Sequence, residues 1–513
     1  EQRRNTQASL MRITRETPLI ISNVSAQEIG RTQDSNAGEV IRRVPGISLI
    51  DDKFVMVRGL SQRYNNVWIN GGAAPSSEAD SRAFSFDLIP SSQIDNLTIV
   101  KVLSAEYPAD YSGGFILIQT RDVPERNSFN VSLGGNFNDR SFKDFMTYNG
   151  KLGSLPGGIG ASLQGFGDRT VDLKANGLDN DWSVRKTNPF SDRKLSASLA
   201  RRWDINGNKL GLSAAANWSR EFRTLDPMQN NLFGVYDHQN NRSNYLRHSV
   251  DSQFNDNSRF GAMLNMTWII PSGVAKFQFK NIFNRIDNHR YTLRDGISAQ
   301  ANEEKSAEYF YRSRTTYNGQ VTGTYYLGDN TLDWCSGFSY ADRIVPDRRR
   351  YLVNDALESG VMALTTGNDV SREWTDLREG ITSLSVNDKQ VFHIGDREGY
   401  VKGGVYGEYR GRRYNTRVFI YNWNVYNNSL PAGFQKMDVP QLLSNPEYFG
   451  EDKLHLLEEL HMRNNYKGEN WLGAGYLNAS IPLGRLEILG GLRYEYNDME
   501  LISNTRDYEK SET

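Results

Sequence analysis

The sequence predicts a two-part fold: a small α/β domain over residues 1–122, followed by an antiparallel transmembrane β-barrel over residues 123–513. Three observations predict it. Helix and strand signals are mixed up to about residue 122, every second residue tends to be apolar from Ser128 onward, and short and long connections alternate along the second part. Alternation of tight turns with long polar loops is expected of outer-membrane barrels, whereas a soluble sandwich has no reason to follow it.

The composition fits such a barrel and excludes other classes of protein. Hydrophobic residues make up 38% of the 513 residues and the mean hydropathy is −0.62, as expected where only alternate strand residues meet lipid. The chain has no run of about 18 or more apolar residues, so no membrane-spanning helix is predicted. The 60 basic and 61 acidic residues give no basic excess, which argues against a nucleic-acid partner. Cys335 is the only cysteine, which excludes an intrachain disulfide and a multi-cysteine zinc site.

The first part alternates between short helices and strands. Ser25 and Glu28 form a capping box that predicts a helix start, and Ser35 is expected to cap a second helix that ends at Pro45-Gly46. The expected strands are residues 47–50, 54–58, 66–70, 98–103 and 114–120. A loop rich in Ser, Ala and Gly follows the third of these strands.

From Ser128 onward the hydrophobic period is two. Along residues 486–496 every second residue is apolar or glycine, and the residues between them include Glu487 and Glu495. The same alternation recurs at residues 210–218, 332–340 and 419–425. Tryptophans near the strand ends fit the aromatic girdles of a membrane barrel, although tryptophan also favours strands in general. Eleven strands are expected, or thirteen if residues 143–165 add two more.

The connections between these strands are predicted to alternate in length. Short turns are expected at residues 204–208, 271–273, 328–330, 410–412 and 482–484. Long polar loops are expected at residues 222–257, 289–308, 343–397 and 428–470. This pattern favours a membrane barrel over a soluble β-domain, which is the alternative.

Residues 54–120 resemble the plug domain of TonB-dependent outer-membrane transporters. The resemblance rests on Val57-Arg58-Gly59, on residues 67–71, on residues 94–102 and on Tyr111-Ser112-Gly113-Gly114, in this order and spacing. It implies a plug that fills the lumen of a barrel of about 22 strands. It further implies a gated importer rather than an enzyme, embedded in the lipid and lipopolysaccharide of the bacterial outer membrane and energised by a TonB-type periplasmic protein.

The resemblance also sets expectations about the two ends of the chain. The predicted strands would make only about half of such a barrel. Because open strand edges are not viable in lipid, further strands are expected beyond Thr513. The TonB box of the family is expected ahead of Glu1.

Arg58 is expected to latch the plug to the barrel wall. In the resembled family a plug arginine at the matching Arg-Gly position packs against wall carboxylates, and Glu487 and Glu495 point into the lumen by strand parity. Lys101 stands where the family often has a second arginine, and it lacks the bidentate fork of that side chain. An exposed surface arginine is the alternative for Arg58.

The apical loops of the plug are expected to contact the ligand. The candidates are Gln62, Arg63, Tyr64 and Asn65, which follow the Arg-Gly pair, and the loop tip Ser81, Arg82 and Phe84, which offers a cation and an aromatic ring. An ordinary polar loop is the alternative at each position. Iron chelates, cobalamin, glycans and peptides are all compatible with a polar lumen.

No residue pattern predicts catalysis, a cofactor or a metal site. His455 and His461 flank two glutamates in an expected loop helix, but a spacing of six does not place both rings on one helix face. Cys335 has lumen-facing parity and is expected beneath the plug. The run Arg348–Arg350 could contact lipopolysaccharide or an anionic ligand, although a solvated loop is the simpler interpretation.

Two other functions stay open on the sequence. The chain could be a non-transporting accessory barrel in an assembly with other outer-membrane proteins. It could instead be a soluble secreted glycan-binding β-domain, which the 11% aromatic content favours. A TonB box in the full gene would argue against the first, and insolubility without detergent would argue against the second.

Overall fold

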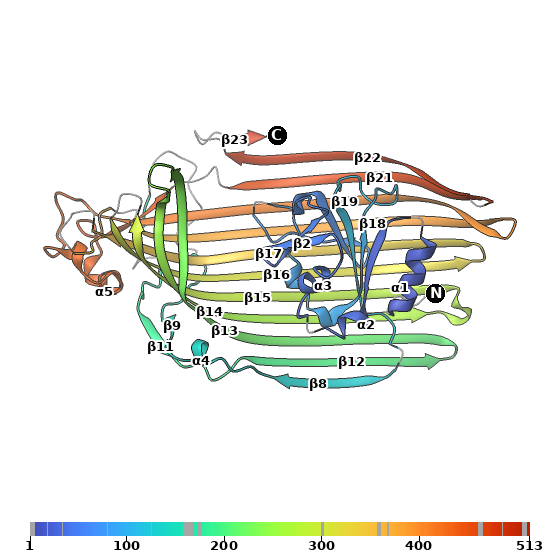
Figure 1. The fold of residues 1–513 in the computed structure, drawn as a ribbon, viewed down its shortest axis with the longest axis horizontal. Coiled ribbons are helices and arrows are strands. Elements are labelled where there is room, and N and C mark those ends of the chain that lie inside the picture. Colours follow the sequence, from blue (N-terminus) through green and yellow to red (C-terminus); the bar gives the residue numbers. More distant parts are fainter. Residues whose placement is uncertain are drawn as a thin grey trace.

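The computed structural model places a small α/β domain against one face of a long antiparallel sheet (Figure 1). The structure describes residues 6–17, 19–32, 34–79, 81–124, 126–156, 169–171, 177–298, 302–355, 361–366, 369–459, 465–484, 486–504 and 510–512. Among these residues, no helix is long and apolar enough to cross a membrane.

The α/β domain, called the plug below, is built on a five-stranded sheet of order β1-β6-β7-β4-β5. β4 and β7 run parallel, and the other neighbouring strands run antiparallel. Its main elements are α1 (Gln7–Glu16), β1 (Ile21–Ser25), α2 (Ala26–Ile29), α3 (Ala37–Ile41), β2 (Ile47–Ile50), β3 (Phe54–Val57), β4 (Asn65–Ile69), β5 (Gly72–Ala73), β6 (Ile94–Val100) and β7 (Gly114–Thr120). Short 3₁₀ helices are η1 (Gln62–Tyr64), η2 (Phe86–Leu88) and η3 (Ser91–Gln93).

Local capping signals place the plug helices. Ser25 caps α2 by accepting a hydrogen bond from Glu28 N, as the capping box predicts. α3 is capped by Asn36 rather than by the expected Ser35, because the Asn36 side chain accepts from Glu39 N while the Glu39 carboxylate accepts from Ser35. α1 is not among the predicted helices; Thr6 caps it.

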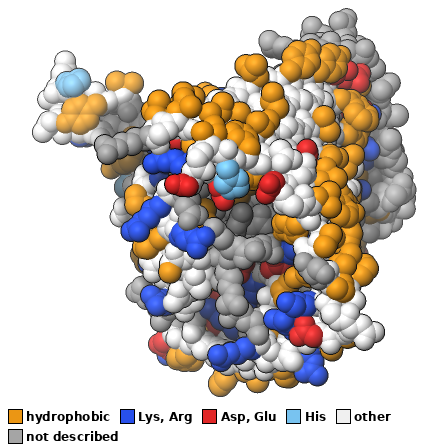
Figure 2. Space-filling view, turned by 90° about the vertical axis from the view of Figure 1, so that its right-hand side faces the viewer, with side chains coloured by type: hydrophobic (Ala, Val, Ile, Leu, Met, Phe, Trp, Pro, Cys, Tyr) orange, Lys and Arg blue, Asp and Glu red, His pale blue; other side chains and the backbone are white. Residues whose placement is uncertain are grey.

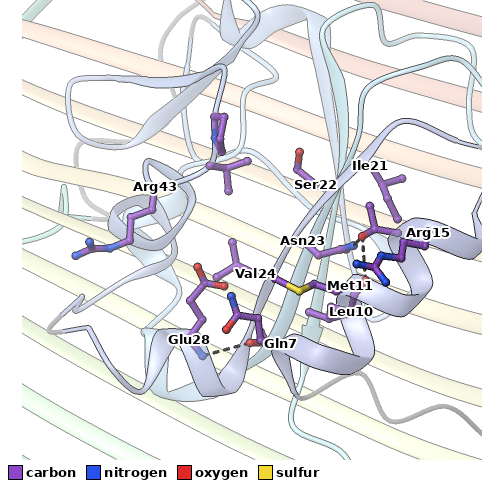
Figure 3. A pocket seen from close by; sticks show the side chains of 14 residues that line it. Gln7, Leu10, Met11, Arg15, Ile21, Ser22, Asn23, Val24, Glu28 and Arg43 are labelled. Carbon is purple, nitrogen blue, oxygen red and sulfur yellow. Dashed lines mark hydrogen bonds between the residues drawn. The ribbon is translucent and has the colours of Figure 1, made fainter.

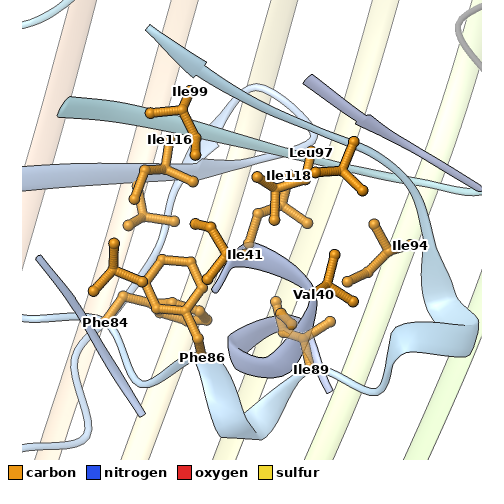
Figure 4. Close-up of a cluster of buried hydrophobic side chains, with 14 of the residues drawn as sticks. Val40, Ile41, Phe84, Phe86, Ile89, Ile94, Leu97, Ile99, Ile116 and Ile118 are labelled. Atoms are coloured by element: carbon orange, nitrogen blue, oxygen red, sulfur yellow. The ribbon is translucent and has the colours of Figure 1, made fainter. Parts of the chain in front are cut away.

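The plug core is aliphatic and extends into the long sheet (Figure 4). Ile41 of α3 lies against side chains of β6 and β7 that are fully buried, namely Leu97, Ile99, Ile116 and Ile118. Ile282 of the long sheet belongs to the same cluster and is 1% exposed. Apolar packing therefore continues from the plug onto the wall, where burial of each such side chain contributes about 1.5–3 kcal/mol.

The long sheet, called the wall below, contains 14 described strands, all in antiparallel pairs. Its main path consists of β8 (Ser128–Gly134), β12 (Arg193–Ile205), β13 (Asn208–Asp237), β14 (Arg242–Ile269), β15 (Ala275–Ser298), β16 (Glu303–Leu327), β17 (Asn330–Asn354), β18 (Val370–Ile394), β19 (Arg397–Asn422), β21 (Tyr466–Leu483), β22 (Leu486–Asn504) and β23 (Lys510–Glu512). Within the described residues, the end strands β8 and β23 do not pair with each other, so the described wall is an open antiparallel sheet.

Four of the five predicted short turns are confirmed, and the predicted loops are too long. Residues 410–412 are wrong as a turn, because they lie inside β19, and the turn precedes Arg397. β13 and β14 continue through most of the predicted loop 222–257, and β18 lies wholly inside the predicted loop 343–397. These strand ends carry many polar side chains, and polar composition alone does not distinguish a strand end in water from a loop.

The two faces of the wall differ in chemistry. The face away from the plug exposes large apolar side chains, among them Leu264, Met266, Phe279, Phe338, Leu384, Val405, Leu477, Ile488, Leu492 and Tyr494. Seen from the end that carries the short turns, hydrophobic side chains gather along the outer rim of the molecule, and charged side chains lie around its middle (Figure 2). An apolar outer face and a polar inner face are expected of strands that meet lipid.

A second apolar cluster lies at the end of the wall away from the short turns. Tyr291 of β15 belongs to it, whereas Ile282 in the same strand belongs to the plug core. Their odd separation places the two side chains on opposite faces of the sheet. Around this cluster lie α4 (Asp139–Phe142), β9 (Phe145–Tyr148), β10 (Arg169–Val171), β11 (Val184–Thr187), η7 (Phe434–Lys436), α5 (Val439–Ser444), η8 (Pro446–Tyr448) and β20 (His455–Glu459).

Two expectations about this end need correction or fall outside the described residues. The segment from His455 forms strand β20 and pairs with β19, so the expected loop helix is wrong. His461 lies outside the described residues. Of the two strands expected within residues 143–165, β9 is present, and the range 157–165 is not described.

Candidate functional site

The candidate functional site is the interface between plug and wall, where charged side chains meet at three places. The first, the base contact, surrounds Asp122 at the end of the plug. The second, the side contact, surrounds Glu106. The third, the apical cluster, consists of Lys53, Glu78, Asp87, Arg314 and Arg343.

Through the Asp122 carboxylate, the base contact ties the chain directly after β7 to two wall strands, β14 and β15. The Asp122 carboxylate accepts hydrogen bonds from Lys276 Nζ (2.8 Å), Gln278 Nε2 (2.8 Å) and Thr267 Oγ1 (2.7 Å). Burial alone would raise the pKa of Asp122, but the charges of Lys280 and Lys276 and these hydrogen bonds hold it well below its usual range. The carboxylate is therefore ionised and pins the plug to the wall at neutral pH.

The side contact joins the loop after β6 to β19 and β22. Lys402 Nζ lies 2.6 Å from the Glu106 carboxylate, and Ala109 N donates to Glu495 Oε1 at 3.1 Å. Arg493 Nε lies 2.6 Å from the same Glu495 oxygen. Glu495 therefore does contact the plug, through a backbone amide rather than through a plug arginine.

The expected latch between Arg58 and the wall is not seen in the described residues. Arg58 Nη1 donates to Lys101 O within the plug at 2.9 Å, and no described ion pair joins Arg58 to Glu487 or Glu495. Ser480 donates to Glu487 instead. Arg58 has φ 53 in the turn after β3, and its side chain folds back over the end of β6. Burial and the neighbouring Arg58 charge lower the pKa of Lys101.

The apical cluster is the most heavily charged of the three contacts. The Glu78 carboxylate lies 3.4 Å from Lys53 Nζ, 3.4 Å from Arg343 Nη1 and 3.6 Å from Arg314 Nη1. Arg314 also pairs with Asp87 of η2 through both terminal nitrogens. The Arg314 side chain is 5% exposed and that of Asp87 16%. This pair is therefore largely removed from solvent.

Titration behaviour follows from this burial. Burial alone would raise the pKa of Asp87, but the Arg314 charge and hydrogen bonds lower it below the usual value. Burial lowers the pKa of Lys53, and Glu78 offsets part of that effect. The Asp87 carboxylate therefore remains ionised beside Arg314 at neutral pH.

Neighbouring wall side chains hold the same plug loop by its backbone. Glu379 Oε1 accepts from Ser76 N at 2.9 Å, and the Glu379 side chain is 0% exposed. Arg410 and Arg412 both contact Glu379. Arg412 additionally donates to Glu78 O. The loop after β5 is thus fixed to β16, β17, β18 and β19 together.

The first group of predicted ligand contacts lies on η1. Tyr64 is 44% exposed, and the Arg63 guanidinium carbon lies 5.8 Å from the centre of its ring. Asn65 begins β4, and its side-chain amide donates to Val55 O at 2.7 Å. Arg63 and Tyr64 are therefore accessible on the plug surface, whereas Asn65 is used within the plug.

In the second predicted group, Arg82 lies near the first group, whereas Phe84 is buried in the plug core. Arg82 lies 2.7 Å from the Asp110 carboxylate, which also accepts from Asn66 Nδ2 at 2.7 Å, so Arg82 is brought next to the first group. Phe84 is 5% exposed and packs edge-on against Phe86 with ring centres 5.1 Å apart. The Phe84 ring belongs to the plug core and not to an exposed loop tip.

Cys335 lies under the plug, as its strand parity predicts. Its Sγ is 4.0 Å from Asn70 O, and a Cβ added at Gly71 would lie 3.4 Å from that sulfur. Gly71 has φ +91, a conformation that glycine adopts without strain. The turn between β4 and β5 thus rests directly on β17.

A cleft of about 400 Å³ lies on the plug away from these contacts (Figure 3). α1, β1 and the turn at Arg43 to Pro45 line it. β1 is an edge strand of the plug sheet. Asn23 Nδ2 donates to Thr14 Oγ1 at 2.9 Å, which joins β1 to α1 beside the cleft.

Sequence reasoning missed the carboxylates and arginines that join plug and wall. Glu78 and Asp122 stand in irregular segments and Asp87 stands in the single turn of η2, so none of them follows a periodic pattern. Arg314 and Arg343 carried a usable signal, because they occupy the polar, inward-facing parity of their strands. In the part of the chain that the structure describes, no group of three or more His, Cys, Asp or Glu residues is placed to hold a metal ion.

Comparisons with known proteins agree with the plug architecture. A family model of the TonB-dependent receptor plug domain matches residues 14–115. The vitamin B12 transporter BtuB of Photobacterium profundum is 33% identical over 179 residues, which cover 33% of this chain and 26% of that protein. The chain therefore matches about a quarter of the length of this curated relative.

Similar solved structures include two receptors of low sequence identity. The unliganded ferric citrate transporter FecA aligns with 96% of this chain and 76% of its own, at 12% identity and a TM-score of 0.34. The siderophore receptor PiuA from Acinetobacter baumannii aligns with 96% of this chain and 81% of its own, at 10% identity and a TM-score of 0.32. Similarity at this level does not by itself establish a shared fold. Residues 14–115 therefore match the plug domain of TonB-dependent receptors, and in this chain that domain is seated on a long antiparallel sheet.

Proposed function

We propose that the chain is a gated importer of the bacterial outer membrane, with a plug over residues 1–122 and barrel wall over residues 123–513. The observation that carries this proposal is the position of the plug. It is docked by ionic contacts on the polar face of a sheet whose other face is apolar. Its ligand belongs to the siderophore, cobalamin, glycan or peptide class.

The chemistry of the contacts supports a movable plug. Most plug–wall contacts at the base, side and apical cluster are hydrogen bonds and ion pairs. Ion pairs removed from solvent contribute little net stability compared with apolar packing of the same volume, because desolvation opposes their attraction. A plug held in this way can be released by a modest force or by a competing ligand without unfolding its own aliphatic core.

The energy for release is proposed to come from a TonB-type periplasmic protein. The sequence has no phosphate-binding loop that would indicate a nucleotide site in the chain itself. The proposed location in the outer membrane brings lipid and lipopolysaccharide into contact with the apolar outer face. That face argues against a soluble glycan-binding domain, because contiguous exposed apolar surface of this kind is rare on soluble monomers.

Uptake in living cells tests the proposal. Cells that express the receptor are given radiolabelled cyanocobalamin and, separately, a panel of ferric siderophores, in the presence and absence of the TonB-type protein. One of these ligands is expected to bind at the surface in both strains and to accumulate only when the energy-transducing protein is present. Accumulation at the same rate in both strains, or recovery of the receptor in a soluble fraction, would contradict it.

A further inference from the structure

The two arginines of the apical cluster lie side by side on neighbouring strands of the wall. Arg314 of β16 is the direct cross-strand neighbour of Arg343 of β17. Ile286 of β15 separates Arg314 from Arg259 of β14 in the same row. Like charges directly opposite each other destabilise a sheet unless an anion lies between them. The wall sequence alone therefore builds a site that requires a negative charge.

The plug supplies that charge only in part. Five positive charges meet in this region, on Lys53, Arg259, Arg312, Arg314 and Arg343. Two negative charges lie among them, on Glu78 and Asp87. Arg312 lies two residues from Arg314, so it is on the same face of β16 at about 7 Å. It makes no ion pair with any described residue. Within the described residues, positive charge is in excess.

The fit of Glu78 to the cluster is loose. Its three cation contacts are 3.4–3.6 Å long, whereas a charge-assisted hydrogen bond is about 2.7–2.9 Å. Arg259, Arg314 and Arg343 each retain a buried Nε with no hydrogen-bond partner in the described structure. Arg314 is 4% exposed as a residue. Buried donors without partners are costly, so a better acceptor would be favoured. The Arg343 side chain is 24% exposed and gives that acceptor a way in.

We propose that the apical cluster binds the oxyanion groups, carboxylate or phosphate, of an anionic ligand, and that these groups compete with Glu78 and Asp87 for Arg314 and Arg343. Binding then releases residues 76–79 and 81–87 from the wall. Ligand binding and loosening of the plug are then coupled, because the arginines that bind the ligand are the ones that hold Glu78 and Asp87. The inference rests on the proposed import function for the role of the ligand as cargo.

Release of the loop is measured on the purified receptor in detergent, with no energy source. Ser77 is 0% exposed, so Ser77→Cys in a Cys335→Ser background reacts with maleimide only when the loop lifts. Citrate and pyrophosphate are compared with chloride at matched ionic strength and with neutral maltotriose. Either oxyanion is expected to raise the labelling rate on the order of fivefold or more. Citrate alone would indicate a carboxylate ligand, and pyrophosphate alone a phosphate ligand.

Variants tie the effect to the cluster. Arg343→Gln is expected to abolish the response to oxyanions, and Asp87→Asn to raise labelling before any anion is added. Glu106→Gln, which alters the distant side contact, is the matched control and keeps the response. Equal labelling in oxyanion and chloride, or an unchanged response in Arg343→Gln, would overturn the proposal. If Asp87→Asn does not fold, the unmodified receptor is titrated with pyrophosphate in a calorimeter. Absence of pyrophosphate binding would then refute the proposal. Neither failure affects the uptake test, which depends on the energy source and not on this cluster.

Discussion

Replacing Asp122 by Asn removes the charge of the base contact while keeping the shape of the side chain. Asp122 accepts three hydrogen bonds from the wall, one of them from Lys276, whose side chain is 7% exposed. Removing one partner of a well-buried ion pair costs about 3–5 kcal/mol. Because the Asp122 side chain is 32% exposed, water can replace part of the interaction, and about 2 kcal/mol is expected. That value corresponds to a change of about 30-fold in the equilibrium between docked and released states.

Hydrogen exchange measured by mass spectrometry reports this equilibrium directly. In Asp122→Asn the backbone amides of residues 118–124 are expected to exchange about 30-fold faster than in the unmodified receptor. Asp144→Asn is the matched control, because Asp144 pairs with Lys186 at the surface with 78% of its side chain exposed. Its exchange pattern around the plug is expected to stay unchanged. An effect of less than twofold in Asp122→Asn would refute the idea that this ion pair holds the base of the plug.

Three further outcomes are expected. The folded-state pKa of Asp122 lies below its unfolded value, so its contribution to docking is complete above about pH 4 and is lost as the pH falls through the lowered folded pKa. The protection of residues 118–124 against hydrogen exchange, taken relative to the intrinsic rate at each pH, should therefore fall only below about pH 4. Leu492→Arg, on the outer face and 81% exposed, should destabilise membrane assembly by about 2–4 kcal/mol, and Leu489→Arg, on the opposite face, by less; equal recovery of both variants from membranes would show the facing to be wrong. Asp347→Asn leaves two arginine side chains buried beside a neutral partner and should make residues 177–184 susceptible to limited proteolysis; unchanged resistance would contradict this role.

The order and spacing of short motifs were enough to predict the plug and the β-rich second part. Strands such as residues 114–120 carry continuous β-branched and aliphatic runs, and the Ser25–Glu28 capping box acts within a single turn. The alternation along residues 486–496 likewise assigns each side chain to a face, because successive residues of a strand point to opposite sides. Cys335 could be placed beneath the plug for the same reason. These signals are local, so they survive without knowledge of the tertiary contacts.

The limits of the strands could not be predicted in the same way. β13 and β14 continue through residues where polar side chains suggested a loop, because backbone pairing between neighbouring strands does not require an apolar face once the strands are in water. The turn expected at residues 410–412 failed for a related reason: its glycine and arginines lie inside β19, where Arg410 and Arg412 face the plug. Polar residues on a lumen face and polar residues in a turn have the same composition.

What the sequence determined by itself is the fold class, the family of the plug and the facing of the strands, since each depends on neighbours within a few residues. What only the tertiary structure decided is which charges meet. Arg58 folds back onto the plug, while Glu78, Asp87 and Asp122, which follow no periodic pattern, meet wall arginines and lysines more than a hundred residues away. An ion pair acts over a few ångströms in space and leaves no trace in sequence spacing, so its partners become known only when the plug is seated on the wall.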